Sequence, residues 1–80
     1  MFFCIKAIEA NPDNYTIKIT YTDDVVVNAD FNDLLDKGVM TPLKNPEVFK
    51  QVSIDSKGRA IVWKTQDIDF CADALRLKFH

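Results

Sequence analysis

The chain has 80 residues, of which 48% are hydrophobic and 28% charged, and its formal net charge is −2. These proportions match those of folded globular proteins and argue against a disordered chain, and the length predicts a single domain over residues 1–80. No run approaches the roughly 18 apolar residues of a membrane-spanning helix, and a negative chain is unlike a general nucleic-acid binder. We therefore expect a cytoplasmic protein that binds neither membranes nor, directly, nucleic acid. A domain this small buries only about 60% of its unfolded surface, so a homodimer is one expected state.

The N-terminal part of the sequence has the pattern of an antiparallel meander. Strict alternation of apolar and polar residues in YTIKITY (15–21) predicts a strand with one buried face. Turn-forming residues precede it (NPDN) and follow it (TDD), and an aspartate of the second turn is expected in the left-handed conformation. In the first strand, the spacing of Ile5 and Ile8 by three predicts a β-bulge. The three predicted strands cover residues 2–10, 15–21 and 25–31.

The sequence then changes from strand to helix patterns. Apolar residues at helical spacing in 31–38 predict one or two helical turns that end at Gly38. A second short helix is predicted to begin at Asn45, a favourable N-cap, followed by Pro46 at the first helical position.

A turn at 55–58 (DSKG) and a strand at 59–64 come next, and the last residues (ADALRLKF) fit either a strand or a short helix, of which we favour the helix. The predicted fold class is therefore α+β: an antiparallel β-meander of three N-terminal strands, two short helices, a further β-hairpin or strand pair, and a short C-terminal helix.

Charge is unevenly distributed along the chain. Residues 1–36 carry two bases and seven acids, a net charge of −5, whereas residues 37–80 carry eight bases and five acids, a net charge of +3. Such asymmetry can steer a basic partner toward the acidic half. Asp23 and Asp24 are therefore candidate binding residues, although solvated loops are the simpler interpretation of these acids.

The sequence offers few residues for metal binding or catalysis. A zinc site needs about four Cys, His or carboxylate ligands, and His80 is the single histidine, so we expect neither a metal nor another cofactor. A serine or cysteine nucleophile would also lack a positioned histidine base. Asp67 and Asp69, which would share one face of a strand, and the nearby Cys71 are the remaining candidates for a small enzyme, but caps and solvated loops explain them more simply. We therefore expect no enzymatic activity.

The two cysteines, Cys4 and Cys71, lie in different segments and do not make a disulfide framework. We expect both thiols to be reduced and largely buried, and a single bridge or a reactive thiol is the alternative.

The single tryptophan, Trp63, is predicted to share a strand face with Ile61 and to lie in the core. The alternative is an exposed anchor for a partner, because tryptophan is prominent in binding hot spots. With Asp69, Asp23 and Asp24, it completes the set of candidate binding residues.

The segment GVMTPLKNPEVFKQVSID (38–55) resembles the bacterial domain-of-unknown-function family 2442. The flanking segments YTIKITYTDDVVVNADFNDLL and IVWKTQDIDFCADAL are similar to the same family, so the resemblance covers nearly the whole chain. The sequence departs from it at Asp24, where that family usually has glycine, and at Lys64 and Ala72, where it usually has proline. These are turn and cap positions, and the departures concern local geometry.

The resemblance implies a small protein, mostly stand-alone and sometimes fused to a DNA-binding helix-turn-helix. Such proteins are often encoded beside another small protein, in pairs suggestive of toxin–antitoxin modules. No catalytic residue carries over. The matching positions imply structural roles: Gly38 ends a helix, Pro46 begins one, and Phe49 and Trp63 lie in the core.

Three functions follow as hypotheses. The first is a non-catalytic protein–protein interaction module, in the antitoxin-like version one member of a two-gene pair, which binds a small basic protein. The second is an accessory domain in DNA binding or transcription regulation. The third, which we consider weakest, is a small enzyme that uses Asp67, Asp69 or Cys71.

Overall fold

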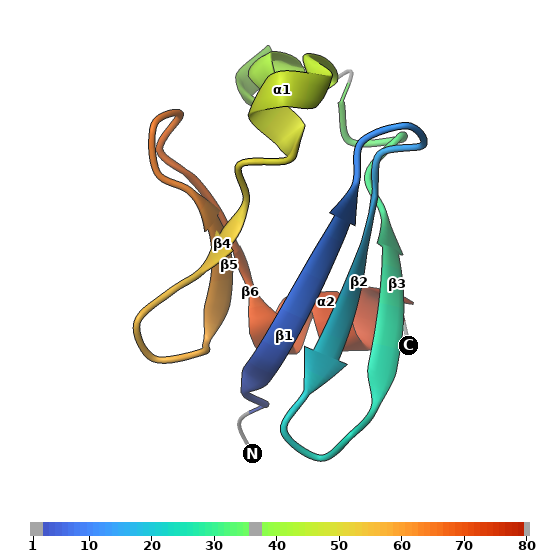
Figure 1. The fold of residues 1–80 in the computed structure, drawn as a ribbon, viewed down its shortest axis with the longest axis vertical. Helices are drawn as coiled ribbons and strands as arrows, with labels where there is room; N and C mark the ends of the chain where they lie inside the picture. The colour runs from blue at the N-terminus through green and yellow to red at the C-terminus, as the bar shows by residue number, and fades with distance from the viewer. Residues whose placement is uncertain (1–2, 36–37, 80) are drawn as a thin grey trace.

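The computed structural model describes residues 3–35 and 38–79, which form two three-stranded antiparallel sheets with short helices (Figure 1). The elements in chain order are β1 (Ile5–Asn11), β2 (Thr16–Tyr21), β3 (Val26–Asp30), the 3-10 helix η1 (Gly38–Lys44), α1 (Pro46–Phe49), β4 (Ser53–Ile54), β5 (Ala60–Trp63), β6 (Ile68–Cys71) and α2 (Ala72–Phe79). The predicted α+β fold class is confirmed, and the ambiguous C-terminal segment is a helix.

The first sheet is the predicted meander, with strand order β1-β2-β3. Its middle strand alternates as expected, so that Ile17, Ile19 and Tyr21 are buried. The predicted bulge is present, because the pairing of β1 with β2 shifts register between Ile5 and Ala7. In the turn from β2 to β3, Asp24 takes a positive φ of 69°, as predicted for an aspartate in this turn.

The second sheet has strand order β4-β5-β6. The turn from β4 to β5 is closed by a hydrogen bond from the Gly58 N–H to the Asp55 carbonyl, 3.1 Å long. The Asp55 carboxylate also accepts the N–H groups of Lys57 and Arg59 at 3.2 and 2.8 Å. Gly58 has a φ of +71°, which is a conformation that favours glycine.

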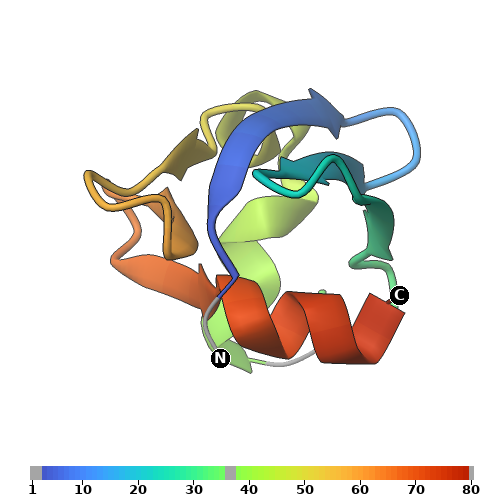
Figure 2. The same cartoon turned by 90° about the horizontal axis from the view of Figure 1, so that it is seen from below.

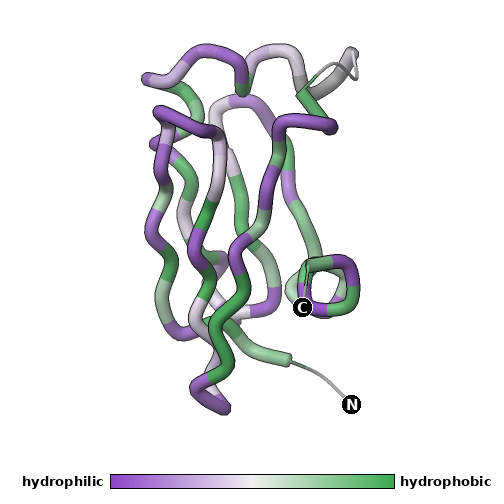
Figure 3. The backbone as a smooth tube through the Cα atoms, turned by 90° about the vertical axis from the view of Figure 1, so that its right-hand side faces the viewer, coloured by the Kyte–Doolittle hydropathy of each residue, from purple (hydrophilic) through white to green (hydrophobic). Residues whose placement is uncertain are grey.

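The two sheets and α2 enclose one apolar core (Figure 2). Hydrophobic and hydrophilic residues alternate along the strands, as Figure 3 shows for the backbone tube, and the hydrophobic ones face this core. Trp63, Phe31 and Phe49 are completely buried and pack together, with ring centroids about 6 Å apart. The indole Nε1 of Trp63 donates to the Phe49 carbonyl at 2.9 Å, which satisfies the one polar group of the side chain.

The helix predicted to begin at Asn45 is confirmed, since the Asn45 side chain accepts the N–H of Glu47 at 3.0 Å and Pro46 opens α1. Of the one or two helical turns predicted at 31–38, the described residues contain one, in which the Phe31 carbonyl accepts the N–H groups of Leu34 and Leu35 at 2.9 and 3.1 Å. Residues 32–35 form a single turn, and residues 36–37 lie outside the described residues. Gly38 begins η1 and does not end a helix, and it lacks the positive φ of a glycine cap.

The prediction that both thiols are largely buried is also wrong. Cys4 is half-buried and Cys71 is exposed, and both are free. Cys71 is exposed because side chains alternate along β6. Ile68 is buried and Phe70 half-buried against the core, so Asp69 and Cys71 face solvent.

Candidate functional site

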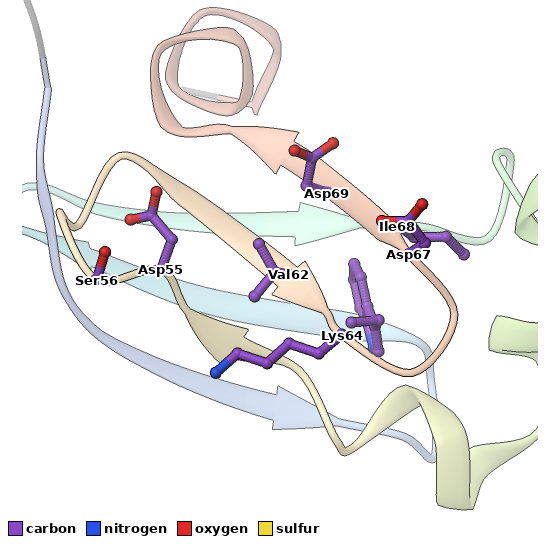
Figure 4. Close-up of a pocket in the computed structure, with 8 residues that line it drawn as sticks. Asp55, Ser56, Val62, Lys64, Asp67, Ile68 and Asp69 are labelled. Carbon is purple, nitrogen blue, oxygen red and sulfur yellow. The ribbon is translucent and has the colours of Figure 1, made fainter.

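An open hollow of about 450 Å³ lies on the second sheet, in the described part of the chain (Figure 4). The residues that line it come from the turn between β4 and β5, from β5, and from the hairpin that joins β5 to β6. They are Asp55, Ser56, Val62, Trp63, Lys64, Asp67, Ile68 and Asp69. Three of these side chains are carboxylates and one is an amine.

Strand pairing sets the geometry of this hollow. Val62 of β5 pairs with Asp69 of β6, and because Trp63 and Ile68 are buried on the inner face, Val62 and Asp69 belong to the outer face. Asp67 lies in the turn between the strands with a φ of +57°, so it does not share a strand face with Asp69 as predicted. The hollow nevertheless brings both carboxylates to its lining.

The three carboxylates of the hollow differ in their hydrogen bonding. The backbone N–H of Arg59 and then that of Lys57 hold the pKa of Asp55 below its usual value. Asp67 and Asp69 are exposed, and neither has an ion-pair partner among the described residues. Lys64 is exposed at the same hollow. The arrangement suits cationic and hydrogen-bonding groups, with Asp67 and Asp69 open to a ligand.

The other two acidic candidates, Asp23 and Asp24, lie away from this hollow in the turn between β2 and β3, and both have cationic partners within the chain. Asp23 accepts from Arg76 at 3.0 and 3.2 Å. Asp24 pairs with Lys6. The hydrogen bond from Arg76 lowers the pKa of Asp23, and the backbone N–H of Val25 adds to this effect. Arg76 comes from the basic half of the sequence and so offsets one negative charge of the acidic half.

The two remaining candidates, Trp63 and Cys71, lie one in the core and one on the surface. Trp63 is among the residues that line the hollow, although its side chain is fully buried in the core. Cys71 is exposed on the outer face of β6 and does not line the hollow.

Sequence reasoning missed Asp55, Ser56 and Lys64 as members of this site. The turn pattern DSKG was recognised, but it indicated only a reversal of the chain. Nothing in that pattern shows that β4 and β5 pair so that Asp55 and Ser56 flank the carboxylates of the next hairpin.

Within residues 3–35 and 38–79, no three His, Cys, Asp or Glu side chains are grouped so that they could hold a metal ion. None of the described helices has the length and apolar character needed to cross a membrane.

Residues 5–80 match the family model described as "Protein of unknown function (DUF2442)". Comparisons of the chain with curated proteins and with solved structures found no match.

Proposed function

The chain belongs to this family of proteins of unknown function, and from that premise we propose that it is a non-catalytic module that binds a basic segment of a small protein partner. The observation that carries the proposal is the pair of exposed carboxylates, Asp67 and Asp69, at an open hollow. Exposed carboxylates attract basic groups of a partner, and this attraction increases mainly the rate and the specificity of association.

The hollow is a better candidate for this surface than the acidic N-terminal half. Asp23 and Asp24 are engaged by Arg76 and Lys6, and a partner would have to displace these cations. Asp67 and Asp69 have no such competitor among the described residues. A basic partner therefore gains more from the hollow than from the turn between β2 and β3.

Exposure also favours binding over acid–base catalysis. A general acid needs a carboxyl group whose pKa is raised by burial, and closed sites provide that burial. Asp67 and Asp69 are exposed at the rim of an open surface. Their chemistry suits reversible ion pairing, as the antitoxin-like member of a two-gene pair would use with a basic protein.

The proposal is tested by co-expressing the protein with the product of the adjacent gene and measuring Kd at low and at physiological ionic strength. We expect a complex that weakens as salt is added, because exposed charges are screened. The variant Asp67→Asn/Asp69→Asn should weaken it by about tenfold or more. The control Asp13→Asn/Asp33→Asn removes the same charge from exposed positions outside the hollow and should change Kd little.

Two results would contradict the proposal. One is that the product of the adjacent gene forms no complex with the wild-type protein. The other is an equal loss of affinity in the two double variants, which would show that net charge and not the hollow determines binding.

A further inference from the structure

The outer edge of β3 carries backbone groups that no described residue satisfies. The N–H of Tyr21 donates to the carbonyl of Val25 at 2.9 Å, and the N–H of Phe31 donates to that of Tyr15 at 3.0 Å. Hydrogen-bonded pairs alternate along an antiparallel ladder, so the residues that bond β2 are 25, 27, 29 and 31. The N–H and C=O groups of Val26, Asn28 and Asp30 therefore point away from the sheet.

The two edges of this sheet are not equally protected. β1 has a bulge between Ile5 and Ala7, and the N–H of Ile5 is taken by the Gly58 carbonyl at 2.7 Å. β3 has no register shift, proline or lysine, which are three of the devices that block an edge strand. Figure 1 shows β3 at the side of the molecule away from the second sheet.

The side chains of β3 are compatible with pairing. Val26 is 45% exposed and is one of two large apolar side chains that the described residues leave exposed. Asn28 and Asp30 are exposed on the same outer face, whereas Val27 and Ala29 are buried against the core. An added strand would thus continue the ladder and cover Val26 without disturbing the packed face.

We propose that β3 pairs antiparallel with β3 of a second copy of this chain, about a two-fold axis through Asn28, to form a continuous six-stranded sheet. In this register Asn28 lies opposite the partner's Asn28, and Val26 lies opposite the partner's Asp30. All three outward-facing residues then exchange hydrogen bonds, roughly six in total, which no other symmetric register achieves within β3.

Charge placement favours this occupant. Asp30 lies opposite an apolar residue and not opposite the partner's Asp30. The two Asp30 side chains are four residues apart along the strand direction, or about 13 Å at roughly 3.3 Å per residue. That separation exceeds the Debye length of about 8–10 Å, so their repulsion is largely screened. The hollow belongs to the other sheet and stays open in the dimer, so this inference does not depend on the proposed function.

Sedimentation velocity over a concentration series tests the proposal. The wild-type mass should rise from 9.2 kDa toward twice that value as concentration increases. Asn28→Lys places two lysines opposite each other and should weaken the dimer by about tenfold or more. Asn28→Asp should do the same, and an equimolar mixture of the two variants should restore a dimer, because opposite charges then meet at the axis.

The control is Ala7→Lys, which adds the same charge at an exposed position of β1 and should leave the dimer intact. Asn28 is exposed but lies opposite Lys18 of β2, so the fold of each variant is checked by tryptophan fluorescence. A wild-type protein that stays monomeric up to about millimolar concentration would overturn the proposal. So would a dimer that Asn28→Lys does not weaken, or a mixture of charged variants that does not associate.

Discussion

The guanidinium group of Arg76 donates to both carboxylate oxygens of Asp23, at 3.2 Å from Nη1 and 3.0 Å from Nη2. The same group lies over the rings of Phe3 and Tyr21, 4.2 and 5.0 Å from their centroids. One side chain thus joins α2 to the turn between β2 and β3 and to the N-terminal segment. Arginine suits this position because its planar group can pair bidentately and stack on aromatic rings at once.

Replacing Arg76 by methionine should lower the free energy of unfolding by roughly 1–2 kcal/mol, because the cation–π contacts with the rings of Phe3 and Tyr21 are lost. Only 11% of the Arg76 side chain is exposed, so its stem also contributes packing. Urea denaturation measures the change. Lys18→Met is the control, since Lys18 is an exposed base without an ion pair among the described residues, and it should be nearly neutral. Equal effects of the two substitutions would contradict the stated role of Arg76.

Asp23→Asn should reduce the loss of stability in acid. The bond from Arg76 lowers the pKa of Asp23 in the folded protein below its ordinary value of 3.8. The stabilisation is therefore fully present above pH ~4 and is lost as the pH falls through the lower folded-state pKa. Between pH 5 and pH 2, the variant should lose less stability than the wild type. Parallel stability curves for the two proteins would refute this linkage.

Gly58→Ala should destabilise the protein by about 1–2 kcal/mol, whereas Gly38→Ala should be close to neutral. Gly58 has a positive φ of 71°, and a Cβ there would lie 3.0 Å from the carbonyl oxygen of Ile5. A Cβ at Gly38 would meet no atom within 4 Å. In a domain of this size, 1 kcal/mol corresponds to a Tm shift of about 4–8 °C, which calorimetry detects easily. Equal Tm values for the two variants would be inconsistent with this description of the turn.

Trp63→Phe should cost about 2–4 kcal/mol of stability, because it leaves a void and an unsatisfied carbonyl on Phe49. Thermal unfolding followed by circular dichroism measures the effect. A useful comparison is Tyr21→Phe, which removes only the 2.8 Å hydrogen bond from a buried hydroxyl to the Ala72 carbonyl and should cost less. A neutral Trp63→Phe substitution would mean that the indole contributes little to the core.

Cys71 should react with a thiol reagent in a fast phase and Cys4 in a slower one. Cys71 is exposed at the edge of the second sheet, and Cys4 is half-buried. Access of the reagent to the sulfur therefore separates the two rates. Cys71→Ser should remove the fast phase, and Cys4→Ser should leave it unchanged. Two equal rates in the wild-type protein would argue against the difference in exposure.

Local patterns predicted the parts of the fold that depend on nearby residues. Alternation in residues 15–21 identified β2 and its buried face, and the Asn45–Pro46 pair identified the start of α1, because caps and pleats are set within a few residues. The helical turn after Phe31 was predicted in the same way, but the role of Gly38 was not. Its apolar spacing fits one helical turn, and Gly38 is as acceptable at the start of a 3-10 helix as after the end of an α-helix.

The candidate site was harder to predict because it depends on contacts between distant segments. The sum of charges in residues 1–36 ignored that Arg76 reaches Asp23 across 53 positions. Asp67 and Asp69 were recognised as candidates, but a strand pattern does not show that Asp67 turns with a positive φ. Asp55 lines the hollow because β4 pairs with β5, and local sequence patterns do not show which strands pair.

The hydrogen bond from the Phe3 N–H to the Asp73 carboxylate, 2.7 Å long, joins residues 70 positions apart. During synthesis at about 5–20 residues per second, Phe3 therefore waits roughly 4–14 s before its acceptor exists. The strands β1 to β3 can pair in that interval, but their inner face lacks α2 until Ala72–Phe79 have been added. The order of synthesis thus leaves the inner face of the meander uncovered for longest, and the core is completed only after α2 has been synthesised.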